Sequence, residues 1–267
     1  MKKNRAKVQV GLVTKKINLG SDFRPLCPKY SMATILQIET ATEVCSIAVS
    51  VAGRLASLKE EPDCRQHIAY VTMLTEACLA DAGIAIDQLD AVAVSAGPGA
   101  YTSLRTGVST AKGLCYALDI PLISVDTLAA LAAGAFELGG LPDEALCISM
   151  VDARRNEVWL SAYRSDLDAL VPAQPLILDD GALEDWVRSL NLGEIEAMLL
   201  AGNGQDKINS SNFGNNTYIR TAKNSSARFL TQIAEKKYKN KEFELLAAFE
   251  PFYMKPPNIT QPAKINP

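Results

Sequence analysis

The chain has 267 residues, of which 48% are apolar and 21% are charged. This length exceeds that of most single domains, and the apolar share suffices for buried cores, so the composition excludes a disordered chain. No stretch reaches the roughly 18 consecutive apolar residues that a membrane-spanning helix needs. We therefore expect a soluble globular protein with two modest domains, and one large domain is the alternative.

The net charge of −3 divides unevenly along the chain. Residues 1–31 hold eight Lys or Arg and one acid, so this segment has a net charge of +7. The remaining residues hold 19 Lys or Arg and 29 acids, which gives them a net charge of −10. Proteins that bind nucleic acid without a partner usually have a patch or stripe of Lys and Arg on their surface. If this protein takes part in RNA chemistry, we expect another subunit to hold the RNA.

The basic segment 1–31 has no apolar run of the kind found in a secretory signal. A strand-like run begins directly after Met32. We therefore predict that folding begins at Met32, and that residues 1–31 are a disordered arm or the product of an upstream mis-start. The first domain would then cover 32–138, and a second, smaller domain with a C-terminal tail would cover 139–267.

Six cysteines are spaced along the chain without any Cys-x-x-Cys pair, at positions 27, 45, 64, 78, 115 and 147. These gaps match neither a zinc module nor a small secreted disulfide scaffold. Several of the cysteines lie in apolar runs, where a free thiol behaves as a small hydrophobe. Reduced core thiols are the prediction, and they indicate a cytoplasmic protein.

The first half predicts a mixed sheet covered by helices, in the order βββαβαβα. Expected strands cover residues 35–38, 47–51, 55–58, 91–95 and 122–125, and expected helices cover 65–82, 104–118 and 128–136. A tight Ala52-Gly53 turn joins the second and third strands. The apolar stripe of the first helix consists of Ile68, Val71, Leu74 and Cys78.

A similar order begins again in the second half. Strands at 146–151 and 158–162 form a hairpin, a helix covers 183–190, and a further strand covers 198–201. Residues 202–226 are rich in Asn, Ser and Gly and predict a loop, and Ser226 begins a last helix. The recurrence predicts a duplicated α/β fold.

Two turns of the first half have the residue types that contact phosphates. Gly97 and Gly99 stand between a strand and a helix, where backbone N–H groups approach an anion closely, and Thr102 follows in the first helical turn. Glu39 and Thr40 end the first strand, and in phosphotransferases with duplicated βββαβα halves this turn holds a metal-linked phosphate. A weak phosphate or nucleotide contact and a purely structural turn both remain open at these positions.

His67 is the only histidine in the chain. Catalytic metal centres use two or three His or several converging carboxylates, and a Ser-His-Asp hydrolase would need a Gly-x-Ser-x-Gly elbow that is absent here. We predict that His67 is an ordinary surface residue in the first turn of its helix, and that the chain holds no metal. The charged group Asp152, Arg154, Arg155 and Glu157 is interpreted as a solvated hairpin turn, with a polar site as the alternative.

Several strings in the sequence together resemble the TsaB (YeaZ) family of tRNA threonylcarbamoyladenosine synthesis. They are Ile38-Glu39-Thr40-Ala41-Thr42-Glu43-Val44-Cys45-Ser46, Ala96 to Gly107, Ala111-Lys112-Gly113-Leu114, Val151 to Val158 and Pro251 to Pro257. The string Gly-Pro-Gly-x-[FY]-Thr-x-[VL]-Arg-x-Gly is the specific one. The matches cover about 33–257 but not the leader. Glu39 stands where the family usually has Asp, which weakens nucleotide binding at that turn.

The resemblance implies a duplicated actin-like, sugar-kinase-like (ribonuclease H-like) fold and a non-catalytic role. The family pairs with a related catalytic subunit, TsaD, which threonylcarbamoylates adenosine 37 of tRNA, and an ATPase, TsaE, joins them. It follows that the chain alone has no activity, that tRNA meets it only through the complex, and that it does not bind a membrane. A homodimer, and ATP or ADP at the complex interface, stay open. The alternative is an ATP-dependent phosphotransferase of the same fold acting on its own.

The resemblance also places the partner on the helices of the first half. Four residues lie off the core stripes of these helices and would form an apolar patch: Tyr70, Met73, Leu114 and Tyr116. The alternative is that some of them widen the core.

Overall fold

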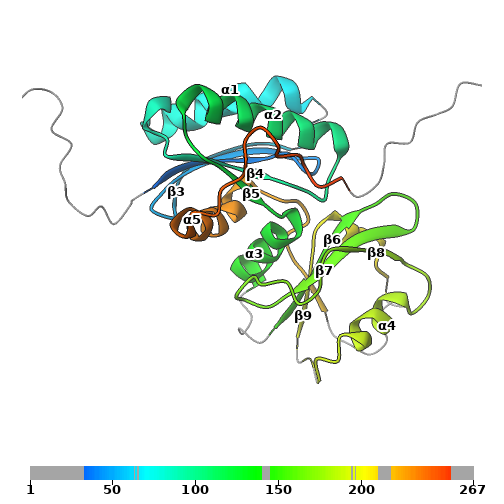
Figure 1. Ribbon diagram of the computed structural model, residues 1–267. Helices are drawn as coiled ribbons and strands as arrows, with labels where there is room; N and C mark the ends of the chain where they lie inside the picture. Colours follow the sequence, from blue (N-terminus) through cyan, green and yellow to red (C-terminus); the bar gives the residue numbers. More distant parts are fainter. Residues whose placement is uncertain are drawn as a thin grey trace, which may run out of the picture. The chain divides into compact units, whose positions relative to one another are not determined.

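The computed structural model describes residues 33–62, 64, 66–139, 145–193, 195, 197–209 and 218–253 (Figure 1). The predicted leader 1–31, Met32 and the residues after Tyr253 lie outside these ranges. No helix in the ranges is both long and apolar enough to cross a membrane.

The first sheet has five strands in the order β3-β2-β1-β4-β5. They are β1 (Thr34–Glu39), β2 (Cys45–Val51), β3 (Arg54–Glu61), β4 (Ala91–Ser95) and β5 (Leu122–Val125). The first three form an antiparallel meander, and β4 and β5 run parallel to β1. Ala52 and Gly53 join β2 to β3 with φ of 51° and 71°, the left-handed conformation that a tight hairpin turn needs. The predicted meander and turn are confirmed.

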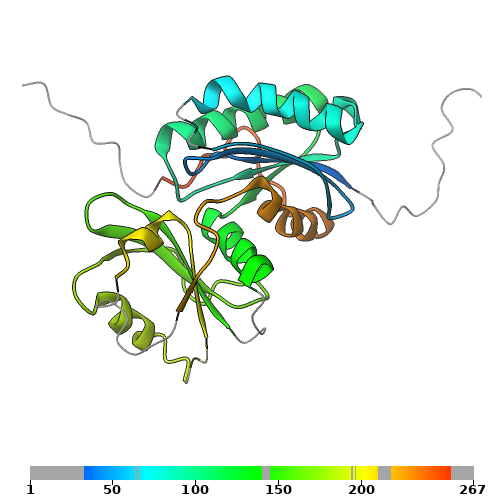
Figure 2. The same ribbon diagram turned by 180° about the vertical axis from the view of Figure 1, so that it is seen from behind.

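Two helices lie side by side on one face of this sheet, α1 (His67–Ala82) over β2 and β3 and α2 (Tyr101–Leu118) over β4 (Figures 1 and 2). Their buried residues include Val71, Leu74, Cys78, Val108 and Cys115, which form one core with the strands. Ile68 does not belong to that core, because 79% of its surface is exposed. Its assignment to the apolar stripe was wrong: the first turn of α1 extends past the part of the helix that packs on the sheet.

The second sheet has the same connection order, β8-β7-β6-β9-β10. Its strands are β6 (Leu146–Asp152), β7 (Glu157–Tyr163), β8 (Gln174–Ile177), β9 (Met198–Ala201) and β10 (Tyr218–Arg220). Helix α4 (Ala182–Ser189) covers it with Leu183, Trp186 and Val187, and α3 (Thr127–Gly139) packs against β6 and β9. Short 3-10 helices occur at η1 (Ile86–Gln88) and η2 (Asn203–Lys207). The repeated order confirms the predicted duplication.

The end of the chain returns to the first sheet. The 3-10 helix η4 (Ala227–Leu230) and helix α5 (Thr231–Asn240) place Phe229, Leu230 and Ala234 against Ile35 and Ile123 (Figure 2). The predicted division at residue 139 assigned this helix to the second half. Its apolar stripe packs on the face of the first sheet opposite α1 and α2. Helix α3 in turn packs on the second sheet.

The five cysteines within the described ranges are all buried and free. Cys45, Cys78 and Cys115 belong to the core of the first sheet, and Cys147 belongs to the cluster between α3 and the second sheet. Burial raises the pKa of Cys45 and Cys147 to about 12, since the thiolate loses its hydration there. The prediction of reduced core thiols is confirmed for these positions.

Candidate functional site

The turn that follows β1 is built around the buried carboxylate of Glu39. One oxygen, Oε1, accepts the N–H of Ala41 at 2.6 Å, and the other, Oε2, accepts the hydroxyl of Ser225 at 2.7 Å. The side chain has no exposed surface. Burial raises the pKa of Glu39 above its ordinary value, although these hydrogen bonds oppose the effect. The carboxylate therefore ties the first turn to the segment that enters η4.

The raised pKa of Glu39 predicts a pH-dependent stability. Below the unfolded-state pKa of about 4.3 the residue is protonated in both states. As pH rises from there through the higher folded-state pKa, the unfolded chain ionises Glu39 freely, whereas the native protein must ionise a buried carboxyl group. The free energy of unfolding therefore falls over this range of pH. Urea unfolding between pH 4.5 and 8 should show wild type losing free energy of unfolding relative to Glu39→Gln, whose side chain does not titrate. The exposed variant Glu76→Gln should follow wild type throughout; a parallel course of Glu39→Gln and wild type would contradict the prediction.

The glycine-rich turn after β4 packs directly on the first turn. A Cβ atom on Gly99 would lie 2.5 Å from the carbonyl oxygen of Ala41, and one on Gly107 would overlap Oγ1 of Thr40. The N–H of Ala100 also donates to the oxygen of Ala41 at 2.8 Å. Glycine is required at both positions because there is no room for a side chain between the packed segments.

The structure thus brings together four of the five residues predicted to contact a phosphate. Glu39 and Thr40 are fully buried, Gly97 and Gly99 pack on this chain's own backbone, and Thr102 is exposed on the first turn of α2. The two turns contact each other directly, through the hydrogen bond from the Ala100 N–H to the Ala41 oxygen and the close packing of Gly99 and Gly107.

A cluster of two tyrosines and one arginine covers the start of α2. The guanidinium of Arg105 lies 4.2 Å from the ring centre of Tyr101 and 5.4 Å from that of Tyr253, and its Nε donates to the Tyr253 hydroxyl at 2.9 Å. Nearby, the N–H of Phe252 donates to the oxygen of Ala96 at 2.7 Å. Two of the strings that carry the family resemblance therefore contact each other, and they hold the C-terminal segment on α2.

His67 is buried, with 8% of its surface exposed, and the prediction of a surface histidine was wrong. The imidazole lies beside the backbone of Thr42 and Val44 in the first turn, and burial lowers its pKa. The β1–β2 turn covers the ring, which a pattern of helical spacing does not reveal. Within the described ranges, no group of three or more His, Cys, Asp or Glu side chains is placed to hold a metal ion.

The four residues predicted to contact a partner differ in their surroundings. Met73 and Tyr116 are 51% and 84% exposed on α1 and α2. Tyr70 and Leu114 are half-buried and pack against the core of the first sheet. Ile68, the misassigned residue, adds a further exposed apolar side chain to α1.

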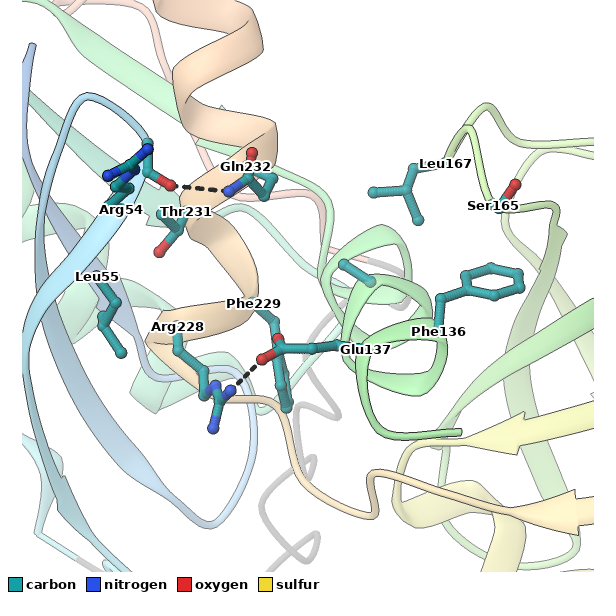
Figure 3. Close-up of a pocket in the computed structure, with 12 residues that line it drawn as sticks. Arg54, Leu55, Phe136, Glu137, Ser165, Leu167, Arg228, Phe229, Thr231 and Gln232 are labelled. Atoms are coloured by element: carbon teal, nitrogen blue, oxygen red, sulfur yellow. Dashed lines mark hydrogen bonds and ion pairs between the residues drawn. The ribbon is translucent and has the colours of Figure 1, made fainter. Parts of the chain in front are cut away.

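A pocket of about 510 Å³ lies among β3, α3, the residues after β7, and the η4–α5 segment (Figure 3). Arg228 forms an ion pair with Glu137 at its wall, and the Gln232 amide donates to the oxygen of Gly53 at 2.8 Å (Figure 3). No sequence motif indicated this pocket, because its lining comes from four separate segments of the chain.

Comparison with known proteins decides the family. The family model described as TsaD: tRNA N6-adenosine threonylcarbamoyltransferase matches residues 61–260. The tRNA threonylcarbamoyladenosine biosynthesis protein TsaB of Haemophilus influenzae is 35% identical over 128 residues, which cover 48% of this chain and 52% of that protein. TsaB of Bacillus subtilis is 33% identical over 166 residues, or 59% and 66% of the two chains. The solved structure of YeaZ from Pseudomonas aeruginosa matches with a TM-score of 0.71 at 25% identity, over 84% of this chain and 100% of that chain. The chain belongs to the TsaB (YeaZ) family.

Membership of the TsaB family agrees with the two sheets of equal strand order, and the predicted duplicated actin-like fold is confirmed. The matches in sequence span about half to two thirds of the length of the curated relatives. The sequence analysis did not identify Ser225, whose hydroxyl donates to the Glu39 carboxylate in the β1–β2 turn. No local pattern could have found it, since the two residues are 186 positions apart.

Proposed function

We propose that this chain is the non-catalytic subunit of a complex that makes threonylcarbamoyladenosine at adenosine 37 of tRNA, paired with a catalytic subunit of the TsaD type. The observation that carries the proposal is the match to the TsaD family model over residues 61–260, combined with relatives that are TsaB proteins of this pathway. It acts in the cytoplasm, with an ATPase of the TsaE type as a further partner.

The side chains of this chain support a partner role over a catalytic one. Its single histidine is buried under the first turn, and the described residues offer no cluster of three or more metal ligands. The first turn and the glycine-rich turn pack directly against each other. ATP turnover by the purified chain should therefore not exceed background.

The surface of α1 and α2 supports the pairing. Met73 and Tyr116 are large apolar or aromatic side chains left largely exposed on the outer side of these helices. Met and aromatic residues are enriched in the centres of protein interfaces. The resemblance to TsaB implies that related subunits pair through the helices of their first halves, so the catalytic subunit, or a second copy of this chain, would bind here.

Depletion of the protein in its native strain tests the proposal. Nucleosides from the total tRNA should lose threonylcarbamoyladenosine, measured by mass spectrometry, and a plasmid copy of the chain should restore it. The catalytic subunit should also co-elute with the tagged chain from native lysate. A normal level of the modified nucleoside after depletion would overturn the proposed function.

A further inference from the structure

The two halves of the fold place two hairpin turns at equivalent positions. The β1–β2 turn and the β6–β7 turn each follow the central strand of sheets with the same connection order. Each begins with a carboxylate that accepts the N–H two residues further on: Glu39 from Ala41 at 2.6 Å, and Asp152 from Arg154 at 2.5 Å. Both turns are therefore stabilised by the same hydrogen bond, from a backbone N–H to the carboxylate two residues before it.

The two turns differ in what covers them. Gly99, Gly107 and Ser225 pack against the start of the first turn. Thr40, Ala41 and Thr42 are buried there, and Glu43 is exposed. In the second half, η2 supports the base of the turn, where Asn203 accepts the N–H of Asp152 at 2.9 Å. Asn156 is bonded to Leu178 on the other side: its amide donates to the Leu178 oxygen at 2.6 Å, and its own carbonyl oxygen accepts the Leu178 N–H at 2.7 Å. Arg154, Arg155 and Asn156 at the tip are exposed. The second turn thus has three exposed residues at its tip, where the first turn has Glu43 alone.

The tip of the second turn presents two arginines in an unusual backbone conformation. Arg154 and Arg155 have φ of 69° and 52°, the left-handed region that favours Gly or Asn. Neither guanidinium makes an ion pair with any part of the chain that the structure describes. The one acid that starts the turn is already paired, since Oδ1 of Asp152 accepts from Nζ of Lys207 at 2.5 Å. The backbone of Arg154 is held within the hairpin, because its N–H donates to Asp152 and its carbonyl oxygen accepts the N–H of Glu157 at 3.3 Å. Positive φ at both central residues is the geometry of a tight hairpin turn, so the two side chains are carried on a fixed backbone.

We propose that the β6–β7 turn binds the phosphate backbone of RNA through Arg154 and Arg155. A guanidinium is planar and donates two parallel hydrogen bonds to a phosphate, which suits a pair of exposed arginines on a rigid turn. The acidic remainder of the chain repels RNA, so the contact is confined to this turn, and the partner subunit supplies most of the affinity. The inference rests on the proposed function, which brings tRNA to the complex.

The variant Arg154→Asn with Arg155→Gly separates RNA binding from folding. Asn-Gly is the dipeptide that favours positive φ in such turns, so the variant should melt at or above the temperature of wild type. The matched control is Lys241→Gly, which removes a positive charge and a left-handed residue (φ 59°) at the end of α5. It should leave RNA affinity unchanged.

The measurement is binding of an unmodified tRNA transcript with adenosine at position 37, at several KCl concentrations. It is made with the complex of this chain and its catalytic subunit, and with the chain alone. The Arg154→Asn, Arg155→Gly variant should lose about tenfold in affinity for each arginine. The slope of log affinity against log salt should become flatter by about two.

Three results would overturn the inference. Equal affinity and salt slope for variant and wild type, in the complex and alone, would show that the turn does not contact RNA. Loss of co-elution with the catalytic subunit would place the two arginines in a protein interface instead. If Lys241→Gly lost as much RNA affinity as the arginine variant, the loss would result from the lower positive charge of the chain and not from a contact at the β6–β7 turn. Failure of wild type to form a complex counts against the proposed function, and the titration of the chain alone still tests the turn.

Discussion

Gly99→Val should destabilise the protein by about 3 kcal/mol, because the new side chain has no space. Its first carbon alone would lie 2.5 to 2.8 Å from three atoms of Ala41, two of which belong to the backbone. The first turn cannot move away, since Glu39 at its start is bound on both carboxylate oxygens. Urea unfolding should show the loss, and the melting temperature should fall by about 6 to 12 °C.

The control for this prediction is the same substitution in the helix that follows. Gly113 lies on α2, and a Cβ atom added there would have nothing within 4 Å, so Gly113→Val removes a flexible residue without a clash. It should remain within about 0.5 kcal/mol of wild type. A Gly99→Val protein with the unfolding midpoint of wild type would show that the contact between the two turns yields easily, and that the turn has no special role in holding α2.

The long elements of the first half were predictable because each contributes many apolar residues to the core. Helices α1 and α2 bury one face each, with buried residues at helical spacing, whereas strands β1 and β4 are buried on both faces and read as continuous apolar runs. Strands β8 and β10 were not predicted. They have four and three residues, and β8 alternates only between half-buried and exposed positions, so little apolar pattern marks them.

The errors at His67 and Ile68 have one physical cause. Helical spacing tells which residues share a face, but not how far along the helix the packed face extends. At the first turn of α1 the covering element is the β1–β2 turn and not the sheet. It buries His67 and leaves Ile68 exposed.

The residues of the candidate site were predictable from the sequence, but the contacts that they make were not. The motifs pointed to Glu39, Thr40, Gly97 and Gly99, and the structure brings all four together. Whether such turns enclose a ligand or each other depends on contacts between distant segments. Ser225 and Phe252 reach these turns from the far end of the chain, and no local pattern encodes that approach.

Met73→Glu combined with Tyr116→Glu should leave the chain folded and abolish its binding to the catalytic subunit. Both side chains are largely exposed, at 51% and 84%, so their replacement creates no buried charge in the chain by itself. In an interface, each carboxylate would be desolvated without a partner, and association should weaken at least about 100-fold. Tyr70 and Leu114 are unsuitable for this test, because they pack against the core and a charge there would unfold the protein.

The matched control is Ile177→Glu on β8, where an apolar side chain of the second half is exposed to a similar extent, 59%. It introduces the same kind of charge away from α1 and α2 and should preserve co-elution. Circular dichroism and thermal melting establish that both proteins are folded before size-exclusion chromatography with the catalytic subunit. If the Met73→Glu, Tyr116→Glu chain keeps a native spectrum and still co-elutes with its partner, the interface lies on another surface, and exposed apolar residues on these helices have no part in assembly.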